Sequence, residues 1–311
     1  MKRVVVIGGG HGQATIMKAL KNLKDVDLCA IVTVADDGGS TGRLRELYNI
    51  PAVGDIRNVL VSLSDSKEFN ELFAYRFKGE DESDVSGHSL GNLVLAALIE
   101  INNGSLPVAI KEMGRMMKTK GRVIPSSLDT ISLYAKYKDG SIEKGEANIP
   151  SKLMHIDKVF YDHDVPGNKE AINAILKADL IIYGIGSLYT SIMPNVIIKD
   201  INDALNESKA KKIYFANAMT QRGETYNYNL KEHVDAFRRH NVPLDLVVAH
   251  KDKIPEDVLA RYIVEEAIEV KDEGNNGVEV ISRSLLDFSK NNVRHSPVKI
   301  RKVVKSLLEK L

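Results

Sequence analysis

The sequence has almost no cysteine and no excess of either charge. Its one cysteine, Cys29, excludes an intrachain disulfide and fits a reducing compartment. Because Cys29 stands in the apolar run from Leu28 to Val34, we expect it to pack as a small core residue. Lysine and arginine together number 43, against 42 aspartates and glutamates. A protein that coats nucleic acid carries a clear basic excess, so we expect no nucleic-acid partner.

Long hydrophobic runs are also missing. The chain begins Met-Lys-Arg, and the apolar run Val4 to Ile7 that follows is too short for the hydrophobic region of a signal peptide. No other stretch reaches the length that crosses a membrane. We therefore expect a cytoplasmic protein without a membrane span. The eight histidines are scattered without zinc spacing, and with one cysteine no metal site of soft ligands is predicted.

What the sequence does contain is an alternation of short apolar runs and helical patterns. Val4 to Ile7 and Leu28 to Val34 are typical of buried parallel strands, and the helical spacing of Ile16, Leu20 and Leu23 between them completes a βαβ unit. Helical patterns also follow Gly87 and Ser296-Pro297. Further strands are expected at Leu180 to Tyr183, Ile213 to Ala216 and Leu244 to Ala249. The alternation predicts an α/β fold with a doubly wound, mostly parallel sheet.

One segment breaks this alternation. Ile131, Leu133, Ala135 and Tyr137 alternate in the period of a strand, and the turn pair Asp139-Gly140 precedes a second extended run. We interpret this segment, about residues 128–150, as a β-hairpin insertion on the rim of one domain that spans 1–311.

Several of the expected strands end in loops rich in glycine and small polar residues, where open parallel sheets bind ligands. The first loop runs from Gly8 through Gly9, Gly10, His11 and Gly12, and its bare backbone N–H groups at a helix start suit a phosphate. It is not a dinucleotide fingerprint, since the third glycine position is Gln13, and it lacks the Lys-Ser/Thr of a P-loop. A tight turn without a ligand, with His11 a spectator, is the alternative.

The second loop contains Asp36, Asp37, Ser40 and Arg43. Its carboxylates suit ribose hydroxyls or a magnesium ion, and Arg43 suits a phosphate. The alternative is that the aspartates cap the next helix. Asp55 and Asn58 stand in a similar setting, and either a cap or a ligand contact would suit them.

The third loop, Gly87 to Asn92, places His88 and Asn92 on one helix face. Its letters match the G-x-S-x-G of a hydrolase nucleophile elbow, but Asp81 to Ser86 is polar and predicts no strand to feed such a turn. A plain helix start is the alternative.

Two later loops complete the set, and each has a structural alternative as a capped or closed turn. The loop from Gly184 to Ser191 carries small hydroxyl residues that suit a diphosphate, and the loop from Asn217 to Thr225 carries amides able to contact a base edge. The segment Val293-Arg294-His295, just before the last helix, is a weaker candidate, for which a plain cap region is the favoured alternative. The candidate residues in these segments are Gly186, Ser187, Leu188, Thr190, Ser191, Asn217, Thr220, Gln221, Glu224, Thr225 and Arg294.

With these loops the sequence resembles the CofD family, and within it the gluconeogenesis-factor branch. The matching stretches keep the family's order over most of the chain from residue 8 to residue 225. They are Gly8 to Gly12, Val32 to Arg45, Gly54 to Asn58, Gly87 to Asn92, Gly186 to Asn195 and Asn217 to Thr225.

The resemblance implies a Rossmann-like fold, UDP-sugar binding, and a role in gluconeogenic growth and cell shape. It places the first glycine loop and Gly186 to Ser191 at a diphosphate, and Asn217 to Thr225 near the base. The related transferases move a phospholactyl group from a guanosine diphosphate donor to a deazaflavin precursor with magnesium, and their acceptor-side aspartate falls on Asp55. The sequence departs from the family at His11, where threonine is usual, and at Ile185 and Arg222, where proline is common.

Three functions are therefore compared. The first is a nucleotide-sugar-binding regulatory protein without turnover, favoured because no acid–base pair or nucleophile stands out. The second is a phosphotransferase of the 2-phospho-L-lactate type, under which Mg²⁺ is the expected cofactor. The third, an NAD-dependent oxidoreductase, is disfavoured by the missing third glycine. The sequence leaves open the base, the sugar, any protein partner and whether the chain forms a homo-oligomer.

Overall fold

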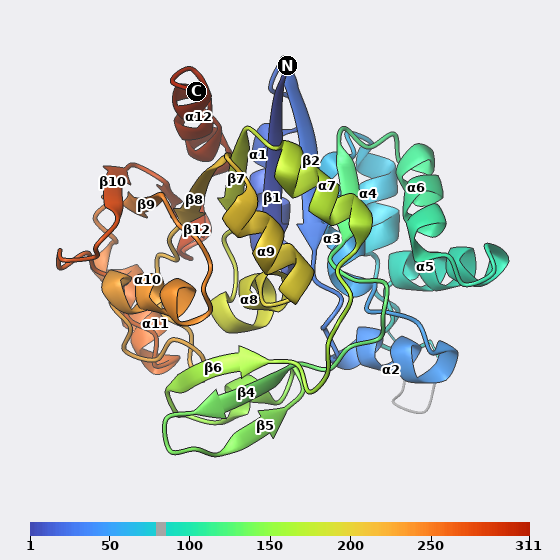
Figure 1. Ribbon diagram of the computed structural model, residues 1–311, viewed down its shortest axis with the longest axis horizontal. Coiled ribbons are helices and arrows are strands. Elements are labelled where there is room, and N and C mark those ends of the chain that lie inside the picture. Colours follow the sequence, from blue (N-terminus) through green and yellow to red (C-terminus); the bar gives the residue numbers. More distant parts are fainter. Residues whose placement is uncertain (79–84) are drawn as a thin grey trace.

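The computed structural model describes residues 1–78 and 85–311, and its centre is a sheet with helices on both faces (Figure 1). Seven strands form the sheet in the order β10-β9-β8-β7-β1-β2-β3, and every neighbouring pair is parallel. The expected α/β, doubly wound class is confirmed. The strands are β1 (Lys2–Gly8), β2 (Val26–Val32), β3 (Arg122–Pro125), β7 (Leu180–Tyr183), β8 (Lys211–Phe215), β9 (Leu246–His250) and β10 (Glu279–Arg283).

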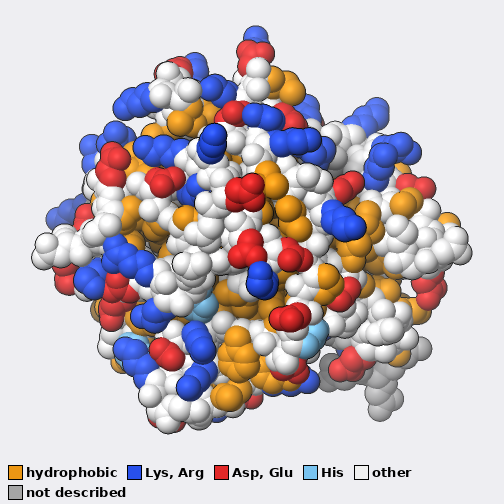
Figure 2. Space-filling view, viewed as in Figure 1, with side chains coloured by type: hydrophobic (Ala, Val, Ile, Leu, Met, Phe, Trp, Pro, Cys, Tyr) orange, Lys and Arg blue, Asp and Glu red, His pale blue; other side chains and the backbone are white. Residues whose placement is uncertain are grey.

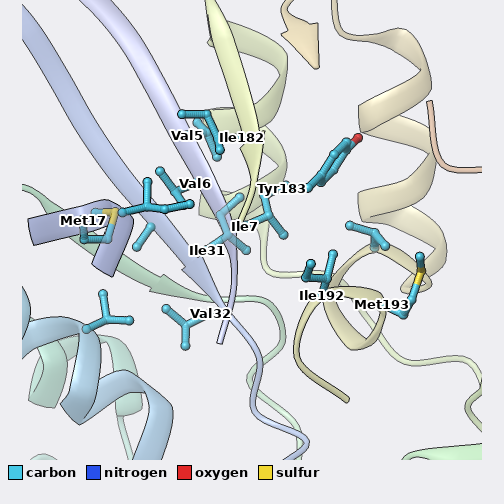
Figure 3. Close-up of a cluster of buried hydrophobic side chains, with 14 of the residues drawn as sticks. Val5, Val6, Ile7, Met17, Ile31, Val32, Ile182, Tyr183, Ile192 and Met193 are labelled. Atoms are coloured by element: carbon cyan, nitrogen blue, oxygen red, sulfur yellow. The ribbon is translucent and has the colours of Figure 1, made fainter. Parts of the chain in front are cut away.

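Strand β1 lies in the middle of the sheet because its side chains are apolar on both faces. Val4, Val6 and Ile7 have no exposed surface, and β1 pairs with β2 on one side and β7 on the other. Figure 3 shows side chains of these three strands packed with Met17 and with Ile192. The strand order therefore reverses between β1 and β7, and such a switch point is where open α/β sheets bind ligands.

The helices cover the two faces. Helix α1 packs against α3 and α12, whereas α7 packs against α9 and lies in front of the strands in Figure 1. The bounds are α1 (Gly10–Leu20), α2 (Gly39–Tyr48), α3 (Gly54–Leu63), α4 (Lys67–Ala74), α5 (Leu90–Ile101), α6 (Leu106–Met116), α7 (Lys169–Lys177), α8 (Met193–Val196), α9 (Lys199–Glu207), α10 (Leu230–Arg239), α11 (Glu256–Val264) and α12 (Pro297–Leu308).

The predicted hairpin is present as part of a three-stranded antiparallel sheet below the main sheet in Figure 1, with the order β5-β4-β6. Strands β4 (Tyr134–Tyr137) and β5 (Ile142–Lys144) flank the predicted turn, where Gly140 has a φ of +87°. The third strand, β6 (Ile156–Phe160), lies beyond the predicted bounds of 128–150. The insertion is thus one strand larger than the hairpin pattern indicated.

Other elements differ from expectation in detail. Strands β3 and β10, and the two-residue strands β11 (Leu286–Asp287) and β12 (Arg294–His295), were not predicted. Cys29 is buried in β2 as expected, and burial raises the pKa of its thiol to about 12. Of the polar stretch before Gly87, residues 81–84 lie outside the described residues. Over the described ranges, no helix has both the length and the apolar character needed to cross a membrane.

Candidate functional site

The glycine loop after β1 touches the glycine loop after β7, as their places at the switch point predict. A Cβ atom added to Gly12 would lie 1.8 Å from the backbone oxygen of Ile185, and one added to Gly186 would lie 3.6 Å from the oxygen of Gly9. Since only a glycine fits at position 12, the two loops share one backbone surface. The structure brings together the two segments that the sequence assigned to a diphosphate.

Two side-chain amides fix the first loop to the strands beside it. Gln13 donates from Nε2 to the backbone oxygens of Val6, at 2.9 Å, and Ile31, at 2.8 Å, while Asn195 donates to the oxygen of Gly8 at 3.0 Å. The N-cap residue Gly9 provides no side-chain cap for α1. Apart from the Gly10 N–H, which bonds to the Asp55 carboxylate, such a helix start keeps N–H groups available to an anion.

Asp55, at the first turn of α3, lies against this loop. A Cβ on Gly9 would stand 2.3 Å from Asp55 Oδ2, and the carboxylate accepts hydrogen bonds from the Gly10 backbone and from the side chain of Asn58. Removal from solvent, followed by the nearby carboxylate of Asp36, raises the Asp55 pKa to about 7. Asp55 can therefore exist in both protonation states near neutral pH, as an acid–base group must.

The two aspartates after β2 have different surroundings. Asp36 lies beside Gly54, whose added Cβ would stand 3.0 Å from its Oδ2, and its Oδ1 accepts from Gly38 N. Asp37 instead accepts from the backbone N–H groups of residue 146, at 3.2 Å, and Ala147, at 2.9 Å. Helix α2 has no side-chain cap bond at its start. Asp36 thus lies near Asp55, whereas Asp37 attaches the insertion to the loop after β2.

Glu146 is a site residue that the sequence analysis missed. It is half-buried, and its pKa is raised to about 8 by burial and then by the carboxylates of Asp36, Glu224 and Asp55. Glu146 lies near the carboxylates of Asp36, Asp55 and Glu224 because the insertion, which Asp37 helps to hold, folds back onto the site. No local sequence pattern could have revealed this. Among the described residues, no group of three or more His, Cys, Asp or Glu side chains is arranged to hold a metal ion.

The candidates of the third loop form a buried network instead of an open surface. Ser40 Oγ lies 2.9 Å from His88 Nδ1, Asn92 donates to Ser40 at 3.2 Å, and Arg57 donates to Asn92 at 3.2 Å. Burial lowers the pKa of His88, with smaller contributions from Arg43 and Arg76. Arg43 itself donates to the backbone oxygen of Ser86.

The serine of the G-x-S-x-G letters has a capping role. Ser89 has no exposed surface, and its hydroxyl accepts from Asn92 N at 3.3 Å at the start of α5. The neighbouring His88 bonds to Ser40, not to Ser89. This arrangement matches the plain helix start that the sequence analysis kept as the alternative.

The loops after β7 and β8 are bonded to each other. Glu224, which is buried, accepts from Tyr189 N at 3.2 Å and from Thr190 N at 3.3 Å and Oγ1 at 3.0 Å. Asn217 donates to the Gly186 oxygen at 2.9 Å, and Gln221 donates to Ser187 Oγ at 2.8 Å. The segment Leu188–Ile192 forms a π-helical turn, a rare geometry that is frequent at functional sites.

Four further candidates of these loops contact other parts of the protein. The hydroxyl of Thr220 accepts from Ile268 N at 2.9 Å, and that of Thr225 accepts from Gln221 N at 2.9 Å. Leu188 has no exposed surface, so it packs in the core. Ser191 is half-buried, and a Cβ added to Gly186 would lie 3.5 Å from the Cβ of Ser191. These residues shape the loops, and a direct ligand contact by each of them stays a prediction.

A groove of about 720 Å³ opens beside these loops. It is lined by Ile185, Gly186 and the segment 217–222, all from the ends of β7 and β8, and by Tyr262 and His295 from the opposite wall. Tyr262 was not predicted, because α11 meets these loops only after folding, whereas His295 belongs to the weaker candidate segment Val293 to His295. Arg294 precedes His295 and lies near the first glycine loop, since its charge, after burial and Arg57, lowers the pKa of His11. Such a groove is large enough for a small organic ligand.

The fold is that of a doubly wound α/β protein with a groove beside its topological switch point. Its relatives agree. The family described as 2-phospho-L-lactate transferase CofD matches residues 4–286. This chain belongs to the CofD family.

Relatives that match nearly the whole chain are named gluconeogenesis factors. The gluconeogenesis factor of Bacillus subtilis is 39% identical over 316 residues, which cover 99% of this chain and 98% of that protein. The gluconeogenesis factor of Listeria monocytogenes is 38% identical over 314 residues, which cover 98% and 95%. A Bacillus halodurans crystal structure described as a UPF0052 family member matches with a TM-score of 0.93 at 39% identity, covering 98% of this chain and 99% of that one.

Proposed function

We propose that this protein is a cytoplasmic nucleotide-sugar-binding regulator, a gluconeogenesis factor that acts through ligand occupancy without turnover and supports gluconeogenic growth and cell shape. The observation that carries the proposal is the groove at the ends of β7 and β8, whose lining includes Ile185 and Gly186 of the glycine loop that touches Gly12 of the first loop. Its relatives' names support the gluconeogenic role.

In this proposal each part of the ligand meets a different chemistry. The uncapped start of α1 and the Gly186–Ser187 turn receive the diphosphate, because backbone N–H groups and a helix dipole favour anions. Asn217 and Gln221 line the groove beside this turn and offer amide groups to a uracil edge. Arg294, whose charge, after burial and Arg57, lowers the pKa of His11, supplies a positive charge near the first glycine loop.

Calorimetry with UDP-glucose tests this function. We expect binding with a Kd of about 1–100 μM and a rise in melting temperature that grows with ligand concentration. Gln221→Ala should weaken binding about tenfold, since it removes a group that lines the groove and orients Ser187. Asn173→Ala, an amide removed from the exposed surface of α7, is the matched control. Absence of heat with UDP-glucose and other UDP-sugars would rule the proposal out.

A phosphotransferase of the 2-phospho-L-lactate type is the second candidate, favoured by Asp55. A carboxyl group with a pKa of about 7 beside a glycine loop suits proton transfer from an acceptor hydroxyl. Incubation with the lactyl-diphosphoguanosine donor, the deazaflavin precursor and magnesium separates the candidates. For a regulator we expect no product, and product that disappears in Asp55→Asn would establish the transferase instead.

A further inference from the structure

A second and larger groove lies at the opposite ends of the strands from the glycine loops. It has a volume of about 970 Å³ and follows the edge strand β3 between α6 and α7. Arg3, Asp27 and Arg122, which line it, stand at the beginnings of β1, β2 and β3. The nucleotide loops follow the opposite ends of the strands, so an occupant of this groove would leave the candidate nucleotide site open.

The rim of this groove is basic, since its six lysines and arginines outnumber its two carboxylates, Asp27 and Glu170, although the whole chain has a net charge of only +1. Arg3 and Arg122 are neutralised by Asp179, at 3.2 Å, and Asp27, at 3.1 Å. Within the described part of the chain, the other four basic side chains have no carboxylate within salt-bridge distance. These four are Lys111, Arg115, Lys118 and Lys177, and all are exposed.

The groove also has an apolar wall and floor. Val108 at the start of α6 is 42% exposed, and Ile110, Val123 and Ala174 line the groove beneath the basic rim. In Figure 2 hydrophobic side chains show between lysine and arginine side chains on the half of the molecule where Figure 1 places α6. A solvated helix face would explain the lysines alone, but it would not place them around a concave apolar strip.

We propose that this groove, from Lys111 to Lys177 across β3, docks an acidic peptide segment of a partner protein, with glutamates or aspartates on the rim and one or two apolar side chains on the floor. The basic rim favours a negatively charged partner. The apolar strip favours a peptide over a polyanion that has no apolar groups. The concave shape disfavours a membrane surface, which would need the basic groups on a flat or convex face.

The test uses the full chain and a fluorescein-labelled, capped short peptide that alternates glutamate with leucine and phenylalanine. Fluorescence anisotropy should show saturable binding that weakens as salt is added. Lys111→Glu with Arg115→Glu should weaken it about tenfold or more. The matched control, Lys302→Glu with Lys310→Glu, reverses two exposed charges in and just after α12 and should change the affinity less than about twofold.

Two further probes decide the class of partner. Replacing leucine and phenylalanine in the peptide by serine should abolish binding, as should replacing glutamate by lysine. An unchanged affinity in the Lys111→Glu, Arg115→Glu protein would overturn the proposal. It would equally be overturned if single-stranded RNA or phosphatidylserine vesicles bound more tightly than the peptide and lost binding in the same variant. Thermal melting of both double variants confirms that they are folded.

Discussion

A Gly12→Ala variant is expected to lose nucleotide-sugar affinity by about a hundredfold, an effect of about 2.7 kcal/mol. The added methyl would stand 1.8 Å from the Ile185 backbone oxygen, so the loop after β7 must move away from the loop after β1. A backbone neighbour cannot turn aside as a flexible side chain can. We expect a loss of about 2–4 kcal/mol in the free energy of unfolding as well. Calorimetry with UDP-glucose and urea unfolding measure the two effects.

Gly104→Ala is the control for this variant. Gly104 has a φ of +83° and open space around its added Cβ, so alanine there introduces backbone strain of about 1 kcal/mol without a clash. It lies between α5 and α6, and UDP-glucose affinity should stay unchanged. If Gly12→Ala bound UDP-glucose as tightly as the wild type, the two glycine loops would not form one ligand surface.

An Asp55→Asn variant is expected to be more stable than the wild type at pH 8. The folded pKa of about 7 lies above the ordinary aspartate pKa of 3.8, and the whole of this difference corresponds to a cost of about 4 kcal/mol for ionising Asp55 in the folded protein. Part of the Asp55 surface remains exposed to solvent, so we expect about half, a gain of about 2 kcal/mol. Urea unfolding at several pH values measures it.

The stability difference between Asp55→Asn and the wild type should grow as the pH rises. Between pH 4 and pH 7 the unfolded chain has released the Asp55 proton while the folded protein keeps it, so wild-type stability falls as the pH rises. The advantage of Asp55→Asn should therefore shrink below about 1 kcal/mol at pH 4.5. Asp139→Asn is the contrasting variant, because hydrogen bonds from Ser141 lower the Asp139 pKa. An advantage of Asp55→Asn that did not change with pH would contradict the raised pKa.

The strands could be predicted where burial makes the pattern continuous. Leu180 to Tyr183 was predicted with the bounds that the structure has, because a strand covered on both faces is apolar at every position. Strand β3 was missed since Arg122–Pro125 is short and ends in proline, and β10 was missed since its residues are exposed or half-buried. Edge strands lack the continuous pattern that burial on both faces imposes.

The loops of the site could be predicted as segments, but the direction of each side chain could not. Glycine and small polar residues at strand ends indicate a binding edge from sequence alone. Whether a polar side chain turns to a ligand or to the protein depends on distant partners, as Thr220 bonding to Ile268 shows. Burial, and then the carboxylates of three other segments, raise the pKa of Glu146. Such surroundings exist only after the chain has folded.

The insertion contacts loops on both sides of the switch point and so links the two halves of the sheet. Asp37, in the loop after β2, accepts hydrogen bonds from the insertion. Gly223, in the loop after β8, packs so closely against it that an added Cβ would stand 1.8 Å from the Pro150 oxygen. Its tip at Gly140 projects into open space. A fluorescent dye placed at that tip would therefore report on relative movement of the two halves while leaving every described ligand loop untouched.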